Sequence, residues 1–262
     1  MSGSIVDKTS TRFAVAVPRI TSNARDNLNK VLSMMDEASV SKADLLLFPE
    51  AVLTGLNLSD HYERDRELAI SIGSSQIQAI IRSAATHRLW TAFGFLELLG
   101  ATIFDSALLV DAYGRIVLHQ RRMSPGWRAK NASPLEYGSG AGLSTALTPW
   151  GKTAILICGD LFEVAFHLAA EAKLDLLLLP FARCFPRKVR EPQRQWNDVE
   201  WPDYSVQIKQ IRALALMSNY IASRDLSGGG FGGGFIVDPH GKLIKAMPLF
   251  EEGLLVWDQT TG

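Results

Sequence analysis

Short, strongly apolar runs constrain the fold of this chain more than any other feature of its sequence. Residues 44–50 (DLLLFPE), 153–158 (TAILIC) and 174–180 (LDLLLLP) show almost no alternation of apolar and polar side chains. Strands of a parallel sheet covered on both faces have this composition, whereas a strand with one solvated face alternates. The runs therefore predict an α/β protein whose strands are buried between other layers.

Segments with a helical spacing of apolar residues alternate with these runs. We expect strands at 12–17, 44–50, 90–97, 153–158 and 174–180, hairpins at 104–122 and 234–247, and helices at 23–40, 63–87, 161–172 and 203–220. Two sheets packed face to face, each covered by helices, would bury the apolar runs on both sides. The similar hairpins suggest two related halves. No linker-like composition separates them, so we expect one domain over residues 1–262.

Composition and charge argue against several classes of partner and compartment. Lysine plus arginine and aspartate plus glutamate both number 27, so electrostatics provide no reason to expect nucleic acid or an anionic membrane as partner. No apolar stretch approaches the length of a membrane span, and the N-terminus lacks the pattern of a secretory signal. Cys158 and Cys184 form neither a disulfide framework nor a metal-ligand spacing. We therefore expect a reduced, cytoplasmic protein.

Three reactive side chains stand at the ends of predicted strands. Glu50 ends an apolar run, where a poorly solvated carboxylate suits a general base. Cys158 stands where a strand passes into a helix, and a thiol there feels the positive end of the helix dipole. Arg122 ends the first hairpin, and a fixed cation beside both groups would stabilise an oxyanion. Taken singly, each also has a structural explanation: an exposed carboxylate, a buried apolar cysteine and a solvated strand end.

In their order and spacing, the three segments resemble those of the carbon-nitrogen hydrolase (nitrilase/amidase) superfamily. FPE with Glu50 is similar to the family's general-base motif, residues 114–122 (GRIVLHQRR) to the segment with its catalytic lysine, and ICGD with Cys158 to its nucleophile motif. The resemblance extends over nearly the whole chain through LLLLP at 176–180, RALALMSNYIA at 212–222 and GFIVDPHGKL at 234–243.

The resemblance implies a four-layer αββα sandwich of the nitrilase type and assembly into a homodimer or a higher homo-oligomer. It also implies hydrolysis of a small amide, carbamoyl compound or nitrile by a Glu–Lys–Cys triad. In this chemistry the base takes the thiol proton, the thiolate attacks the substrate carbon, and a cation steadies the oxyanion before water releases the thioester. The mechanism implied by the resemblance uses no cofactor and no metal ion.

The segment around Arg122 departs from the family pattern, because Arg122 stands where the family has its lysine. A guanidinium is planar, bulky and permanently charged, so it can hold an oxyanion but cannot donate a proton. Lys130, eight residues further along, is an alternative cation if its loop folds back. Glu136 is our candidate for the second glutamate with which many relatives position substrate, although Lys130 competes for that alignment.

The loop at Phe181, Ala182 and Arg183 corresponds to the segment that shapes substrate specificity in relatives. The planar fork of Arg183 suits a bidentate pair with a substrate carboxylate. A surface arginine is the structural alternative for this position.

Two interpretations of the departures stay open. The first is an active amidase with catalytic Glu50, Arg122 and Cys158. The second is a relative that keeps the fold and binds a ligand or partner without turnover. The presence of both base and nucleophile at matching strand ends favours the enzyme, because a binding protein has no chemical use for that pair. An acyltransferase that passes the acyl group to an amine or thiol would use the same residues.

Overall fold

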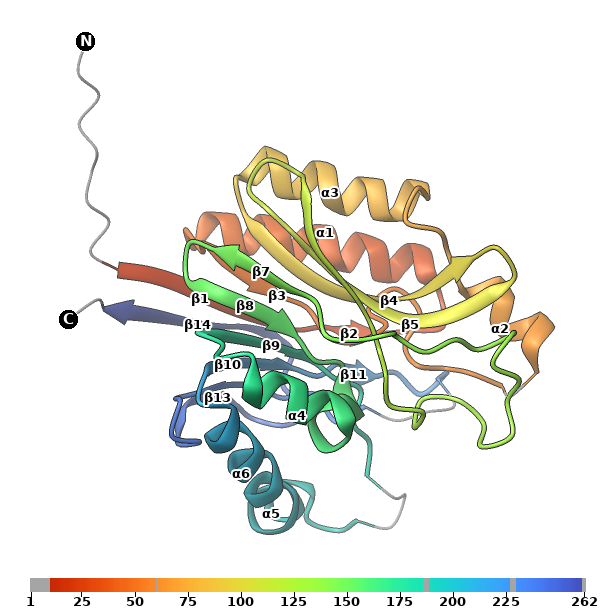
Figure 1. Cartoon of the computed structure of the whole chain (residues 1–262). Coiled ribbons are helices and arrows are strands. Elements are labelled where there is room, and N and C mark those ends of the chain that lie inside the picture. The colour runs from red at the N-terminus through yellow and green to blue at the C-terminus, as the bar shows by residue number, and fades with distance from the viewer. Residues whose placement is uncertain (1–9, 60, 186–188, 227–229, 261–262) are drawn as a thin grey trace.

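The computed structural model describes residues 10–59, 61–185, 189–226 and 230–260. Within these ranges, two six-stranded sheets stack face to face, and helices cover the outer face of each (Figure 1). This arrangement confirms the predicted four-layer αββα sandwich. None of the helices in these ranges is long and apolar enough to span a membrane.

The strands of each sheet come from both near and distant parts of the chain. The first sheet contains, in spatial order, β14 (Gly253–Thr260), β1 (Ser10–Val17), β3 (Leu45–Leu47), β4 (Trp90–Leu99), β5 (Thr102–Val110) and β6 (Ile116–Arg121). The second contains β13 (Leu243–Met247), β12 (Gly234–Val237), β10 (Leu214–Ser218), β9 (Leu176–Pro180), β8 (Gly151–Ile155) and β7 (Thr145–Thr148). A separate parallel pair consists of β2 (Arg19–Ile20) and β11 (Ile221–Ala222).

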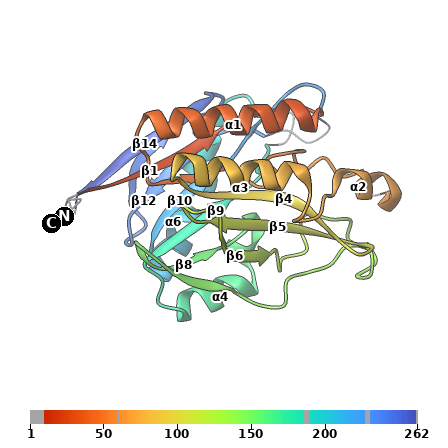
Figure 2. The same cartoon turned by 90° about the horizontal axis from the view of Figure 1, so that it is seen from above.

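Helices form the two outer layers, as the views in Figures 1 and 2 show. The first sheet is covered by α1 (Ala24–Val40) and α3 (Ser75–His87), and the second by α4 (Val164–Glu171) and α6 (Trp201–Ile211). Shorter helical segments are α2 (Tyr62–Leu68), η1 (Cys158–Phe162), α5 (Pro192–Gln195) and η2 (Trp196–Glu200). Asn23 caps α1, because its side chain accepts hydrogen bonds from the N–H groups of Arg25 and Asp26.

The two sheets share one plan. Each has three parallel strands in the middle, which are β1, β3 and β4 in the first sheet and β8, β9 and β10 in the second. A single antiparallel strand flanks the first of the three, and an antiparallel hairpin flanks the last. The two predicted hairpins occupy equivalent places, which agrees with the suggestion of two related halves.

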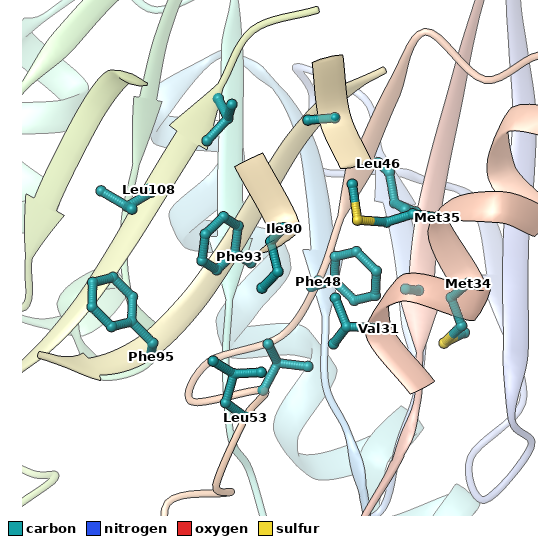
Figure 3. Packing of buried hydrophobic residues seen from close by; sticks show 14 of the residues in the cluster. Val31, Met34, Met35, Leu46, Phe48, Leu53, Ile80, Phe93, Phe95 and Leu108 are labelled. Atoms are coloured by element: carbon teal, nitrogen blue, oxygen red, sulfur yellow. The ribbon is translucent and has the colours of Figure 1, made fainter. Parts of the chain in front are cut away.

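The leucine run in β3 shows why the apolar runs lack alternation. Leu46 belongs to the cluster closed by α1 and α3, together with Met35 and Ile80 (Figure 3). Leu45 and Leu47 point the other way, into the cluster between the two sheets. All three leucines are fully buried, and each such burial stabilises the fold by about 2 kcal/mol. Because both faces of the strand are covered, both sets of side chains are apolar.

Two of the predicted helices have different bounds in the structure. The segment 63–87 is not one helix but two, α2 and α3, because Ile70 between them makes a bridge to Glu97 of β4. The predicted helix at 203–220 ends at Ile211, and its last part is the strand β10. Arg212 takes the left-handed conformation that ends a helix, and the apolar run after it is buried on both faces.

Candidate active site

The nucleophile candidate Cys158 lies just beyond the end of β8, where the chain turns into the short 3-10 helix η1. Its backbone is left-handed, with φ of 49°. That conformation costs a non-glycine residue on the order of 1–2 kcal/mol and occurs preferentially at functional sites. The predicted passage from strand to helix is therefore present, and it holds the cysteine in a strained turn.

Asp160 fixes this turn from within. Its side chain is fully buried, and Oδ2 accepts a hydrogen bond from the N–H of Ile157 at 3.2 Å. Oδ1 accepts from the N–H groups of Met123 (3.0 Å) and Ser124 (2.8 Å), just after β6. Burial raises the pKa of Asp160, and these N–H groups oppose that effect. One carboxylate thus ties the nucleophile turn to the segment that carries the arginine.

Glu50 lies in the turn after β3, and its side chain is fully buried. The next residue, Ala51, is also left-handed, with φ of 46°. The turn packs against β4, where the Gly94 N–H donates to the Pro49 carbonyl (3.1 Å) and the Val52 N–H donates to the Gly94 carbonyl (3.0 Å). A Cβ at position 94 would lie 2.7 Å from the Glu50 Cα, so glycine is required for this close approach.

Replacing Gly94 with alanine is expected to lower the free energy of unfolding by about 1–3 kcal/mol, because the added methyl group meets backbone atoms that cannot move aside independently. Urea unfolding measures the effect. Gly142→Ala is the matched control, since a Cβ there meets nothing within 4 Å and should change stability by less than about 0.5 kcal/mol. Equal losses in the two variants would contradict the role given to Gly94.

Arg122 follows β6, and its guanidinium is almost fully buried. Nε donates to the Ser124 Oγ at 2.7 Å, and Nη1 donates to the Glu50 Oε1 at 2.8 Å and, more weakly, to the Asp105 Oδ2 at 3.3 Å. Nη2 lies against Gly159, where an added Cβ would come within 2.6 Å of it. The structure therefore joins Glu50 and Arg122, far apart in the sequence, in one buried ion pair.

The protonation of Cys158 depends on its burial and on this ion pair. Burial raises the pKa of the thiol to about 12, and Glu50 contributes to the rise, whereas Arg122 and the N–H of Ala182 lower the pKa. The expected effect of the helix dipole does not dominate, because η1 is only five residues long and desolvation of the thiolate is larger. At neutral pH the thiol is protonated, so its use as a nucleophile requires a base.

A cavity of about 700 Å³ opens over the cysteine. Arg122, Cys158 and Gly159 line it, and Tyr204 of α6 and Tyr220 contribute aromatic side chains. Its volume lies in the range of small-molecule sites. Within the described ranges, no group of three or more histidine, cysteine, aspartate or glutamate side chains is arranged to hold a metal ion.

The segment after β9 forms part of the cavity wall. Ala182, Arg183 and the exposed Cys184 line the cavity. The buried Asn219 holds this segment, accepting from the Arg183 N–H (3.3 Å) and donating to its carbonyl (3.0 Å). The Arg183 guanidinium is already engaged in a bidentate pair with Glu200, at 2.7 and 2.9 Å. In this arrangement the Arg183 guanidinium is not free to bind a substrate carboxylate in the cavity.

The remaining predicted site residues lie away from the cavity wall. Phe181 is fully buried and stacks on Trp196 in the core. Lys130 is exposed and does not line the cavity, so Arg122 is the cation that the structure places beside Cys158. Glu136 is half-buried and also does not line the cavity, and its carbonyl accepts from the N–H of Ile103 in β5.

Several site residues escaped the sequence analysis. Asp105 of β5 contacts Arg122, and its signal is a carboxylate inside the largely apolar strand TIFDSALLV. Ser124 holds the Nε of Arg122, and a serine in a loop carries no distinguishing signal. Tyr204 and Tyr220 line the cavity but have the same sequence pattern as core aromatics.

Comparison with known proteins places this chain in a family. The carbon-nitrogen hydrolase profile matches residues 12–260. The chain belongs to the carbon-nitrogen hydrolase family. It is similar to the formamidase of Pseudomonas syringae pv. syringae (strain B728a), with 33% identity over 154 residues, which cover 57% of this chain and 43% of that protein. The chain spans about half the length of the curated relatives it matches.

Solved structures of this carbon-nitrogen hydrolase family share the fold. The carbon-nitrogen hydrolase from Helicobacter pylori G27 superposes with a TM-score of 0.80 at 16% identity, covering 95% of this chain and 89% of that one. A glutamate-to-glutamine variant of the amidase from Nesterenkonia sp. AN1 superposes with a TM-score of 0.77 at 17% identity, covering 99% and 94%. At these identities the likeness concerns the fold.

Proposed function

We propose that this carbon-nitrogen hydrolase cleaves the non-peptide C–N bond of a small amide through a thioester on Cys158. The observation that carries the proposal is the buried Glu50–Arg122 pair beside a protonated thiol at the wall of a small-molecule cavity. In this assignment Glu50 is the base and Arg122 the fixed cation. A carbamoyl compound or a nitrile is the alternative substrate class. Cytoplasmic location and assembly into a homodimer or higher oligomer stay predictions.

The mechanism begins with transfer of the thiol proton from Cys158 to Glu50. The thiolate then attacks the amide carbon, and the C=O electron pair moves to the oxygen to form an oxyanion. Collapse of this intermediate expels the amine or ammonia, which takes the proton from Glu50 as it leaves. Water, deprotonated by the same carboxylate, attacks the thioester and releases the acid and the thiol. The pKa of the thiol, raised to about 12, explains why the step requires a base in contact with the site.

Arg122 can serve the oxyanion without giving up a proton. One side of its fork is occupied by Ser124 and the carboxylates, which fixes its plane. Nη2, on the other side, lies against Gly159, and both residues line the cavity. A preorganised donor of this kind stabilises developing negative charge by about 3 kcal/mol in comparable sites. A permanently charged group suits this role, and burial does not neutralise it, because Glu50, Cys158 and Asp105 keep its pKa raised.

The relatives support an amide as the substrate. The formamidase of P. syringae carries the activity in its name, and in the Nesterenkonia amidase variant the acetamide moiety of fluoroacetamide is bound covalently to the active-site cysteine. Fluoroacetamide is a useful probe here, because an alkyl fluoride reacts slowly with an ordinary thiol and requires an activated one.

The test is incubation of the wild-type chain with fluoroacetamide and with a panel of small amides. We expect one acetamide adduct per chain, mapped to Cys158 by peptide mass spectrometry, and ammonia release from at least one amide. Cys184 lines the same cavity and is exposed, so it serves as the internal control for non-specific alkylation. An adduct on Cys184 alone, or neither adduct nor ammonia, would contradict the proposal and favour a binding role.

A further inference from the structure

Two buried carboxylates, Glu50 and Asp105, face one buried guanidinium. Nη1 of Arg122 reaches Oε1 of Glu50 at 2.8 Å and Oδ2 of Asp105 at 3.3 Å. The second oxygen of each carboxylate, Oε2 of Glu50 and Oδ1 of Asp105, is buried without a hydrogen-bond partner. A buried polar atom left without a partner costs about 1–3 kcal/mol, and more when charged. Two such oxygens in one cluster therefore require an explanation.

The charges of the cluster point to the same problem. If Glu50 and Asp105 were both ionised, Arg122 would balance only one of them, and the dry interior would hold an unpaired charge. Asp160, close by, adds a further carboxylate and so cannot supply the balance. A single proton shared by the two orphan oxygens would satisfy both of them and bring the Glu50–Asp105–Arg122 cluster to zero net charge.

We propose that Asp105 is a positioning residue, which shares one proton with Glu50 and keeps the buried cluster neutral until Cys158 ionises. The inference rests on the proposed function for its catalytic meaning, but not for the proton itself. The shorter bond from Arg122 goes to Glu50, so Glu50 carries the negative charge and Asp105 the proton. Burial raises the pKa of Asp105 well above its ordinary value, and the charge of Glu50 and the hydrogen bond that a shared proton makes with it raise the pKa further.

The shared proton makes thiolate formation easier. When the proton of the Cys158 thiol moves to Glu50, one negative charge leaves the carboxylate and one appears on sulfur, so the net charge of the site is unchanged. An ionised Asp105 would add a second negative charge, and the pKa of Cys158 would rise further with it. A neutral Asp105 does not raise the pKa of Cys158 in this way, so the thiolate forms more easily. Asp105 therefore acts through Glu50 and does not need to touch the substrate.

The two tyrosines and the arginine around the pair keep one state across the useful pH range. Burial raises the pKa of Tyr204 and Tyr220, which feel the charge of Glu50, so both stay neutral. Arg122 stays charged. The remaining neighbours are Asp160, whose oxygens accept three backbone hydrogen bonds, and Cys158 itself. Loss of the Asp105 proton is therefore the event that we expect to limit the site on the alkaline side.

Stability as a function of pH tests the shared proton without any turnover. The pKa of Asp105 is raised in the fold, so the native state keeps a proton that the unfolded chain loses, and wild-type stability falls as pH rises above about 4. Asp105→Asn keeps the shape and a neutral donor and removes this fall. Relative to the wild type, its melting temperature should therefore rise steadily from about pH 4 to about pH 8.

Asp111→Asn is the matched control for this measurement. Asp111 is also buried and lies in the same hairpin, but hydrogen bonds from Arg115 and Tyr113 outweigh burial and lower its pKa. Because the pKa of Asp111 is lowered in the fold, the melting-temperature deficit of Asp111→Asn should widen as pH rises toward about 4 and stay constant above it. If the melting temperature of Asp105→Asn relative to the wild type shows the same pH dependence as that of Asp111→Asn, Asp105 is an ordinary ionised partner of Arg122 and the shared proton is excluded.

The positioning role is read from the pH profile of Cys158 alkylation by fluoroacetamide. Asp105→Asn should react within about threefold of the wild-type rate at neutral pH and should lose the alkaline fall. Asp105→Ala, which supplies no donor to Glu50, should react at least about tenfold more slowly. Identical profiles for Asp105→Asn and the wild type would overturn the role. Absence of both a wild-type adduct and ammonia release would refute the proposed function, while the stability measurement would still decide the shared proton.

Discussion

Cys158→Ala is expected to abolish ammonia release from every amide that the wild-type chain hydrolyses. Without the sulfur no thioester can form, and nucleophile removal in comparable enzymes lowers kcat by a factor on the order of 10⁶. The fold should persist, because alanine tolerates the left-handed backbone at this position no worse than cysteine does. Loss of activity should therefore occur without loss of the folded state.

Cys184→Ala is the matched control, since it removes the other cysteine of the same cavity. We expect it to keep ammonia release within about threefold of the wild type, because its side chain is exposed and lies outside the Glu50–Arg122 ion pair. Initial rates on one amide substrate, with circular dichroism to verify folding, measure both variants. Residual turnover in folded Cys158→Ala at the wild-type rate would show that the thioester mechanism is wrong.

The buried strands were predictable from the sequence because their signal is local. The leucines of β3 and of β9 are covered on both faces, so apolar side chains follow one another without interruption. The run that forms β10 also fits helical spacing through its alternating leucines and alanines, so the sequence predicts a helix where the structure has a strand. The strands β7 and β14 were missed, since their side chains are partly exposed and their pairing depends on distant partners.

The reactive groups of the site were predictable, but their coupling was not. Glu50, Arg122 and Cys158 each end a strand or stand just past one, and that position is visible in the sequence. The contact between Asp105 and Arg122 arises from the register of β5 and β6, in which the Arg122 N–H donates to the Asp105 carbonyl at 2.8 Å. Register and the orientation of a loop follow from tertiary packing, which no local pattern encodes. The positions of Glu136 and Lys130 away from the cavity wall also follow from tertiary packing, so they were not predictable from the sequence.

Replacing Arg122 with methionine is expected to destabilise the protein by about 3–5 kcal/mol and to stop turnover. The change keeps most of the side-chain volume but removes the one charge that Glu50 and Asp105 share, so a buried negative charge is left without a partner. Ser124 and Asp160 offer no replacement, because one is neutral and the other is acidic. The loss should be smaller in acid, where protonation of the carboxylates removes the unpaired charge.

Urea unfolding of Arg122→Met at about pH 5 and about pH 8 measures both the size and the pH dependence of the effect. Arg115→Met is the control, since Arg115 also pairs with a buried aspartate but is itself 72% exposed, and exposed pairs contribute about 0–1 kcal/mol. The double variant Arg122→Met/Asp105→Asn should lose less than the sum of its single changes, because an amide cannot ionise and the buried site then holds at most one unpaired negative charge. Additive losses would mean that Arg122 and Asp105 are not coupled. A loss of stability in Arg122→Met no larger than in Arg115→Met would mean that the buried arginine does not hold the carboxylates.

Arg122→Lys keeps the charge but not the planar fork of the guanidinium. Its turnover relative to Arg122→Met therefore separates what the oxyanion gains from charge alone from what it gains from a donor held in one plane.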